Sequence, residues 1–195
     1  MRILILGPQG SGKGTQAKRI AEFYGVPHIA TGDMFRAAVA EDSELGQRVA
    51  PILEEGGLVP DDLTIEIIRE RLADEDGFVL DGFPRTMAQA EALDELLREL
   101  GRNLDVVFDF QVPHHELLLE RMLRRAAEEG RSDDTPEAIT RRLELYERET
   151  APLVEYYRTM RNNVVGIHAD RTIEQVFHEI EQSLDEVQRH RKVEA

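Results

Sequence analysis

Residues 7–15 read GPQGSGKGT and directly follow an apolar run, RILIL, at residues 2–6. Glycines at this spacing let successive backbone N–H groups turn toward phosphate oxygens, and the N-terminus of a following helix attracts the anion. The lysine supplies a charge that reaches the β and γ phosphates. We therefore predict a phosphate-binding loop for a nucleoside triphosphate, rather than a glycine-rich turn without ligand. The residues expected to surround the phosphates are Gly10, Ser11, Gly12, Lys13, Gly14 and Thr15.

Predicted strands and helices alternate along the chain. The run at residues 2–6 is typical of a strand buried on both faces, and a helix is expected from about residue 12 to residue 24. Thr172 and Gln175 form a capping-box start for the last helix, whose polar tail after about residue 186 is expected to fray. Pro152 is expected to kink or break the helical run around it. Further strands are expected at residues 26–30, 78–80, 106–112 and 164–168.

This alternation predicts an α/β fold with a doubly wound parallel sheet, which binds ligands beyond the carboxyl ends of its strands. The 195 residues suffice for one domain. The net charge of −15 makes nucleic acid an unexpected partner, because that partner calls for a basic surface. The absence of cysteine excludes disulfides and thiolate metal sites. No run approaches the ~20 apolar residues of a membrane span, and the N-terminal run is too short for a signal peptide. We expect a cytoplasmic protein that does not bind membranes.

Arginines in several separate places indicate a second anion site. Residues 31–36 read TGDMFR and residues 81–89 read DGFPRTMAQ, and each stretch follows a predicted strand at the ligand edge of the sheet. Arg121 and Arg125 are four residues apart and so project from one face of a helix. Arg131 and Arg142 follow later. The chain has no NKxD segment, which argues against a switch GTPase.

In order, spacing and context these motifs resemble those of the adenylate kinase family, over nearly the whole chain: GPQGSGKGT, TGDMFR, GGLVPDD, DGFPRT with Gln89, GRSDD and YERETAPLVEYY. DGFPRT is specific to nucleoside monophosphate kinases, and TGD with Gln89 resembles the adenylate branch. Uridylate/cytidylate kinases typically carry Ala-Gly-Asp at the first site and Asn in place of Thr86. The resemblance implies a P-loop kinase fold with five strands in a single kinase domain over residues 1–195. It also implies a small helical insert that binds the monophosphate at residues 30–59, and a short lid at residues 126–136.

The resemblance implies reversible, Mg²⁺-dependent phosphoryl transfer from ATP to AMP, which gives two ADP and balances the adenine nucleotides. Such a transfer depends mainly on positioning and electrostatic stabilisation. Guanidinium groups suit it because they bind phosphate bidentately and stay charged. The implied catalytic residues are Lys13, Arg85, Arg125, Arg131 and Arg142.

The same resemblance divides the site between two nucleotides. Arg36 and Arg85 hold the AMP phosphate, and Gln89 reads the edge of its adenine. On the ATP side the glycine loop is joined by Arg121, Arg125, Ala169 and Arg171. Phe83–Pro84 is expected to be a cis peptide that sets the direction of Arg85. The other residues implied on the AMP side are Thr31, Gly57, Leu58, Val59, Gly82, Phe83, Pro84, Arg131 and Arg142.

Mg²⁺ is expected to lie mainly on nucleotide phosphates. Gly14 stands where the common loop pattern has Ser or Thr, and the hydroxyl comes one residue later, at Thr15. No direct protein ligand is therefore predicted, and Asp81 is expected to orient the metal through water. No zinc is expected, and the six histidines show no metal-binding spacing.

Some of these residues have a structural alternative. Arg121 and Arg125 fit ordinary surface charges as well, on a segment where Glu120 and Arg124 have the spacing of a helical ion pair. Thr86 and Gln89 have capping-box spacing, which is compatible with a role of Gln89 at the base. For the remaining acidic residues of these motifs we favour roles as caps or arginine partners: Asp33, Asp133 and Asp134.

Seven cations at these sites imply a positive cleft in an acidic protein, which would steer anionic nucleotides inward. A monomer that binds ATP, AMP and ADP is expected. Two other functions stay open. One is a kinase of the same fold for UMP or CMP, against which Thr31 and Gln89 argue. The other is a nucleotide-binding regulatory module without turnover, against which the complete set of cations argues.

Overall fold

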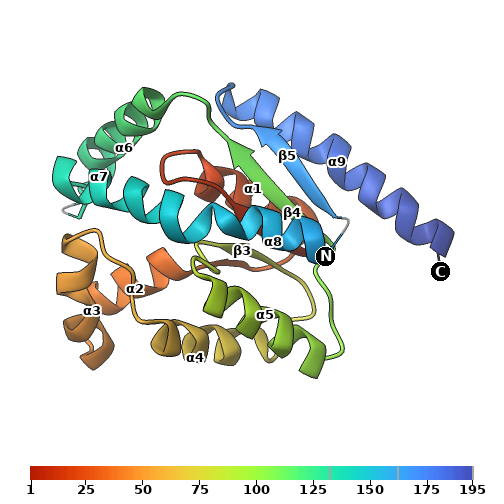
Figure 1. The fold of residues 1–195 in the computed structure, drawn as a ribbon, viewed down its shortest axis with the longest axis horizontal. Coiled ribbons are helices and arrows are strands. Elements are labelled where there is room, and N and C mark those ends of the chain that lie inside the picture. The colour runs from red at the N-terminus through yellow and green to blue at the C-terminus, as the bar shows by residue number, and fades with distance from the viewer. Residues whose placement is uncertain (132, 162, 195) are drawn as a thin grey trace.

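The computed structural model describes residues 1–131, 133–161 and 163–194, and it shows a parallel sheet with helices on both faces (Figure 1). The strand order is β2-β3-β1-β4-β5, and all neighbouring strands are parallel. The chain leaves the central strand for one side of the sheet and later returns to the other, so the loop after β1 lies where the winding reverses. This confirms the predicted doubly wound, five-stranded fold. The strands are β1 Arg2–Leu6, β2 His28–Ala30, β3 Phe78–Asp81, β4 Val106–Gln111 and β5 Val164–His168.

Helices cover both faces of the sheet, and two pairs of helices, α2 with α3 and α6 with α7, extend from one end of it. Figure 1 shows α2 and α3 on one side of the molecule, with α6 and α7 facing them from the other side of the same end. The helices are α1 Lys13–Tyr24, α2 Thr31–Ala40, α3 Glu44–Glu54, α4 Asp61–Leu72, α5 Met87–Glu99, α6 His115–Glu129, α7 Pro136–Leu145, the π-helical turn η1 Tyr146–Thr150, α8 Pro152–Met160 and α9 Ile173–Glu194.

The core has two halves because β1 is buried on both faces. Ile3 and Ile5 pack with residues of α1 and α9, whereas Leu4 and Leu6 pack with residues of α4, α5 and α8. All four side chains are at most 2% exposed. A strand that buries both faces reads as a continuous apolar run, so this part of the sequence prediction is confirmed.

Element boundaries differ from the predicted ones by one or two residues. The second strand begins at His28, after Pro27, whose missing N–H excludes it from a regular ladder. The strand predicted at residues 106–112 ends at Gln111, shortly before Pro113, and the strand at residues 78–80 continues to Asp81. The first helix begins at Lys13, with Gly12 as its cap.

The interruption expected at Pro152 is present, but it lies one turn earlier. The backbone N–H of Ala151 donates to Tyr146 O at 2.8 Å, a five-residue step that closes the π-helical turn η1. Pro152 then occupies the first position of α8, where no N–H is required. The last helix, α9, continues to Glu194 over a segment that contains no glycine or proline, and the expected fraying of its polar tail after about residue 186 stays a prediction.

Within the described ranges no helix is long and apolar enough to cross a membrane. The predicted lid at residues 126–136 includes Ser132, which lies outside the described residues, and GRSDD is therefore described only in part.

Candidate active site

A cavity of about 710 Å³ lies beyond the carboxyl ends of the strands. Its lining comes from the glycine loop, the start of α2, the loop before α4, the turn after β3, and helices α6 and α7. All predicted site residues except Phe83 contribute to this lining. The Phe83 side chain is 1% exposed and packs in the hydrophobic core instead. The peptide between Phe83 and Pro84 is cis, as expected.

The glycine loop has the backbone that its sequence predicts. Gly7, Gly10 and Gly12 have φ values of 145°, 81° and 91°, which disfavour any residue with a Cβ. At Gly10 an added Cβ would also lie 2.8 Å from Leu118 O. Lys13 Nζ donates to Pro8 O at 2.7 Å, so the loop folds back over its lysine. Burial lowers the pKa of Lys13 to about 8, against an opposing contribution from Asp81.

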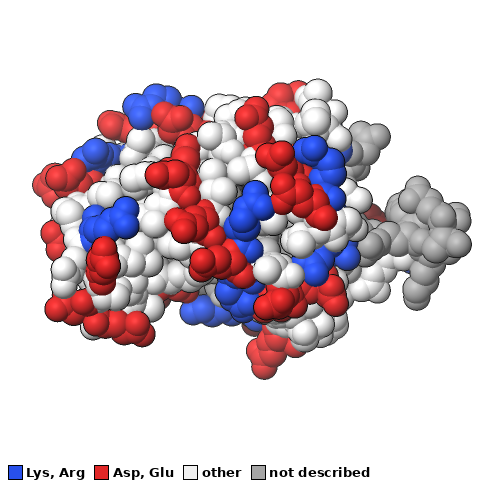
Figure 2. Space-filling view, turned by 90° about the horizontal axis from the view of Figure 1, so that it is seen from below, with Lys and Arg blue, Asp and Glu red and all other residues white. Residues whose placement is uncertain are grey.

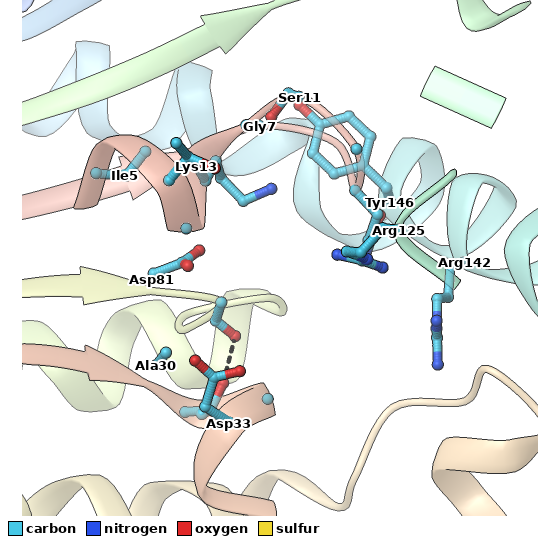
Figure 3. A pocket seen from close by; sticks show the side chains of 18 of the residues that line it. Ile5, Gly7, Ser11, Lys13, Ala30, Asp33, Asp81, Arg125, Arg142 and Tyr146 are labelled. Atoms are coloured by element: carbon cyan, nitrogen blue, oxygen red, sulfur yellow. Dashed lines mark hydrogen bonds between the residues drawn. The ribbon is translucent and has the colours of Figure 1, made fainter. Parts of the chain in front are cut away.

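Asp81 ends β3 directly beneath this loop (Figure 3). His28 Nε2 lies 3.5 Å from Asp81 Oδ2. Burial acts to raise the pKa of Asp81, but the neighbouring His28 ring and the charges of Lys13 and Arg85 outweigh burial, so the pKa is lowered. A Cβ at Gly14 would lie only 3.3 Å from Asp81 Oδ2. The carboxylate therefore takes up the space beside position 14, where the common loop pattern places a hydroxyl side chain.

Two arginines, Arg125 from the predicted ATP side and Arg142 from the predicted AMP side, converge on the carboxylates that follow α6. Arg125 donates through Nε and Nη2 to Asp134 Oδ2, at 2.9 and 2.7 Å, and Arg142 donates through Nη1 to Asp134 Oδ1. Arg142 Nη2 donates to Asp133 Oδ2 at 2.7 Å and to Leu53 O at 3.1 Å. Figure 3 shows both guanidinium groups across the cavity from Lys13. The expectation that these aspartates are arginine partners is confirmed.

The arginines of the AMP side come from α2 and from the turn after β3. Arg36 Nη2 donates to Asp33 Oδ1 at 2.5 Å, so Asp33 is also an arginine partner. Arg85 Nε donates to Gly82 O at 2.8 Å, and Thr31 Oγ1 donates to the same oxygen at 2.9 Å. Burial lowers the pKa of Arg85 to about 10, with further contributions from neighbouring arginines. Positive charge is thus crowded in this half of the cavity.

Gln89 takes part in the cap of α5 and also lines the cavity. Thr86 caps α5 by accepting from the Gln89 backbone N–H at 3.3 Å. The Gln89 side chain lines the cavity and at the same time accepts from the backbone N–H of Arg85 at 2.8 Å and donates to Asp61 Oδ1 at 2.7 Å. The backbone of Gln89 is therefore part of the helix cap, while its side chain is part of the cavity wall.

The remaining predicted arginines lie at the rim of the cavity, and one of them joins two parts of it. Arg121 Nη1 donates to Ala169 O at 2.8 Å, which joins α6 to the loop after β5. Arg121 is therefore not an isolated surface charge, whereas Arg124 on the same helix pairs with Glu128 at 3.9 Å. Arg131 Nε donates to Glu129 Oε2 at 2.6 Å. Arg171 also lines the cavity, at the rim near α9.

Tyr146, Thr150 and Leu53 are among the residues that line or brace the cavity and were missed by sequence reasoning. Tyr146 and Thr150 line it from η1, and Thr150 Oγ1 donates to Arg85 O at 2.8 Å. Leu53 contributes the backbone oxygen that accepts from Arg142. The motif YERETAPLVEYY contains the first two residues, which are four apart and share a face of the helical turn, but the motif alone does not mark them as lining residues. Leu53 acts through its backbone, so its residue type carries no signal.

This cavity contains a glycine loop suited to one phosphate chain. A second set of cations, which includes Arg36 and Arg85, faces the loop. That arrangement on a doubly wound parallel sheet defines a P-loop kinase that acts on nucleoside monophosphates.

A family model described as adenylate kinase matches residues 5–162, and the chain therefore belongs to the adenylate kinase family. An adenylate kinase from Thermus thermophilus is 55% identical over 155 residues, which cover 80% of this chain and 82% of the relative. One from Bifidobacterium longum is 53% identical over 160 residues, covering 80% and 86%. One from Cyanothece sp. is 51% identical over 160 residues, covering 80% and 82%. The protein transfers a phosphoryl group from ATP to AMP and gives two ADP.

Proposed function

We propose that the cavity binds ATP on the glycine loop and AMP on the arginines of α2 and the turn after β3, so that the phosphoryl group moves between Lys13 and Arg85. The observation that carries this division is the placement of the cations on both sides of one cavity, with Asp81 between them. Asp81 lies beneath Lys13 at the end of β3, and Arg85 belongs to the turn that follows the same strand (Figure 3).

Arg131 and Arg142 bridge donor and acceptor in this proposal. Arg142 is nearly buried, and oxygens of Asp133, Asp134 and Leu53 hold its guanidinium group between α7 and the end of α3. Charge on the moving phosphoryl group is spread over its oxygens, and positioned guanidinium groups stabilise it. Residues 30–59 and residues 126–136 are proposed to close over the nucleotides and exclude water from the γ-phosphate.

Mg²⁺ fits this site through the nucleotide rather than through a protein cage. In the described part of the chain no group of three His, Cys, Asp or Glu side chains is placed to hold a metal ion. Asp81 is the carboxylate beneath the glycine loop, and its lowered pKa keeps it ionised near neutral pH. When bound, Mg²⁺ would neutralise phosphate charge, and Asp81 would orient its water ligands. A monomer in the cytoplasm completes the proposal, and light scattering tests the oligomeric state.

A coupled assay of ADP formation with AMP, UMP, CMP and GMP tests the acceptor assignment. We expect AMP to be strongly preferred. Preference for UMP or CMP would replace this assignment with that of a pyrimidine kinase, and no ADP from any acceptor would remove the kinase function.

Arg131→Ala tests the bridging role. We expect kcat to fall by roughly 10³-fold, as for a transition-state arginine, with little change in the affinity for ATP alone. Arg141→Ala is the matched control, because Arg141 is exposed and pairs with Glu55 on the outer face of α7. Equal losses in turnover and in ATP affinity for Arg131→Ala would show that it acts in ground-state binding.

A further inference from the structure

The Gln89 carboxamide lies between two partners of opposite hydrogen-bonding character. Its Nε2 donates to Asp61 Oδ1 at 2.7 Å, and its Oε1 accepts from the Arg85 backbone N–H at 2.8 Å. A carboxylate can only accept and a backbone N–H can only donate. An amide turned by 180° would lose both hydrogen bonds and place like groups together. Because Gln89 is 2% exposed, water cannot readily replace them. The orientation of the amide is therefore fixed.

Asp61 is held in place for this task. Its Oδ2 accepts from Thr86 Oγ1 at 3.0 Å, and Thr86 is the residue that caps α5. Asp61 is the first residue of α4, where the N-terminus of the helix favours a negative charge. Asp61 is not one of the described residues that line the cavity. It therefore acts on a ligand only through Gln89.

A fixed amide presents its remaining groups in a fixed order. Gln89 Oε1 keeps one lone pair and Nε2 keeps one N–H. Adenine offers an amino donor at C6 beside the acceptor N1. Hypoxanthine and guanine offer the reverse, a carbonyl acceptor at C6 beside an N1–H donor. An amide that cannot turn thus matches the first edge and opposes the second.

We propose that Asp61 is a positioning residue that sets the base preference of the acceptor site, by holding the Gln89 amide in the orientation that fits adenine. This rests on the proposed function, in which Gln89 reads the base of AMP.

The test compares AMP with IMP, which has the same sugar and phosphate but the reversed base edge. Asp61→Asn gives Gln89 a neighbour that both donates and accepts, so that the amide is no longer held by an acceptor-only group. We expect the ratio of kcat/KM for AMP to that for IMP to fall about tenfold, the equivalent of one hydrogen bond. The change should lie in KM for the acceptors, with KM for ATP unchanged.

Asp62→Asn is the matched control. It removes the same charge from the same helical turn, but Asp62 is exposed. We expect its AMP-to-IMP ratio to equal that of the wild type. An equal loss for both acceptors in Asp61→Asn, with the ratio unchanged, would overturn the proposal and leave Asp61 a purely structural role.

Gln89→Ala separates this inference from the proposed function. If its KM for AMP and its AMP-to-IMP ratio match the wild type, Gln89 does not read the base, and the assignment of the acceptor site fails. If Gln89→Ala loses the preference while Asp61→Asn keeps it, only the role of Asp61 fails.

A measurement on the wild-type protein decides the matter if Asp61→Asn does not fold. NMR detects scalar coupling across hydrogen bonds, here from Gln89 Nε2 to the Asp61 carboxylate carbon and from Arg85 N to the Gln89 amide carbon. Both couplings support the proposed orientation. The second coupling without the first overturns it.

Discussion

Replacing Asp134 with Asn removes the carboxylate on which two cavity arginines converge. The Asp134 side chain is 0% exposed, and it accepts from Arg125 and from Arg142. Breaking a buried ion pair on one side typically costs about 3–5 kcal/mol. The Arg125 side chain is 28% exposed, and Arg142 keeps Asp133 as a partner. We therefore expect the lower end, a loss of about 3 kcal/mol in the free energy of unfolding.

Urea denaturation without nucleotide measures this loss as a shift of the midpoint at constant slope. Glu55→Gln is the control, because its ion pair with Arg141 is 52% and 68% exposed on the two sides. Such an exposed pair contributes at most about 1 kcal/mol. With saturating ADP the loss in Asp134→Asn should shrink, because phosphate oxygens then accept from the same guanidinium groups.

Two results would refute this reasoning. A loss no larger than that of Glu55→Gln would show that Asp134 does not offset the buried charge of the arginines. A loss that stays the same with saturating ADP would show that nucleotide phosphates do not reach Arg125 and Arg142.

Three further predictions follow from the geometry of the glycine loop and the charge of the surface. Burial lowers the pKa of Lys13 to about 8, and bound phosphate favours the charged form of the lysine, so ATP binding should take up a proton and weaken as the pH rises through 8. Calorimetry in buffers of different ionisation enthalpy measures this proton uptake. ATP binding without proton uptake above pH 8 would contradict the prediction. Gly10→Ala and Gly12→Ala each cost about 1–2 kcal/mol for a left-handed backbone, but only at Gly10 does the new Cβ meet Leu118 O, at 2.8 Å, while the space at Gly12 is open. Thermal denaturation should rank Gly10→Ala as the less stable, and equal melting temperatures would count against the steric argument. Many carboxylates, with some Lys and Arg among them, spread over the face shown in Figure 2, whereas the predicted cations line the cavity. The association rate of ATP should therefore fall as ionic strength rises, and stopped-flow rates independent of salt would exclude steering.

The sheet and the loop were predictable because their signals are local. An apolar run followed by glycines and a lysine determines a strand, a turn and a helix start within about 20 residues, without any distant contact. The resemblance then placed every predicted site residue but one around the cavity. Phe83 is the exception, and its side chain packs in the core, because a motif marks a segment and does not say which side chains of that segment point into the core.

Other features depend on tertiary contacts that the sequence does not display. The contact from Asp61 to Gln89 spans 28 positions in the chain, and that from Thr150 to the Arg85 backbone spans 65. The polar end of α9 lacks the apolar periodicity by which helices are recognised, so the pattern did not indicate that the helix continues to Glu194, although no helix breaker occurs there.

Because the cavity arginines pair with Asp133 and Asp134, an anion that binds these arginines must displace a carboxylate. A phosphate group entering this half of the cavity competes with carboxylates tethered beside the guanidinium groups, at an effective concentration in the millimolar range or above. Small anions that make only one such contact are at a disadvantage against this internal counter-ion, whereas a nucleotide brings a chain of phosphates and a base held elsewhere. We therefore expect inorganic phosphate to inhibit only at high concentration, which a titration of the initial rate can measure.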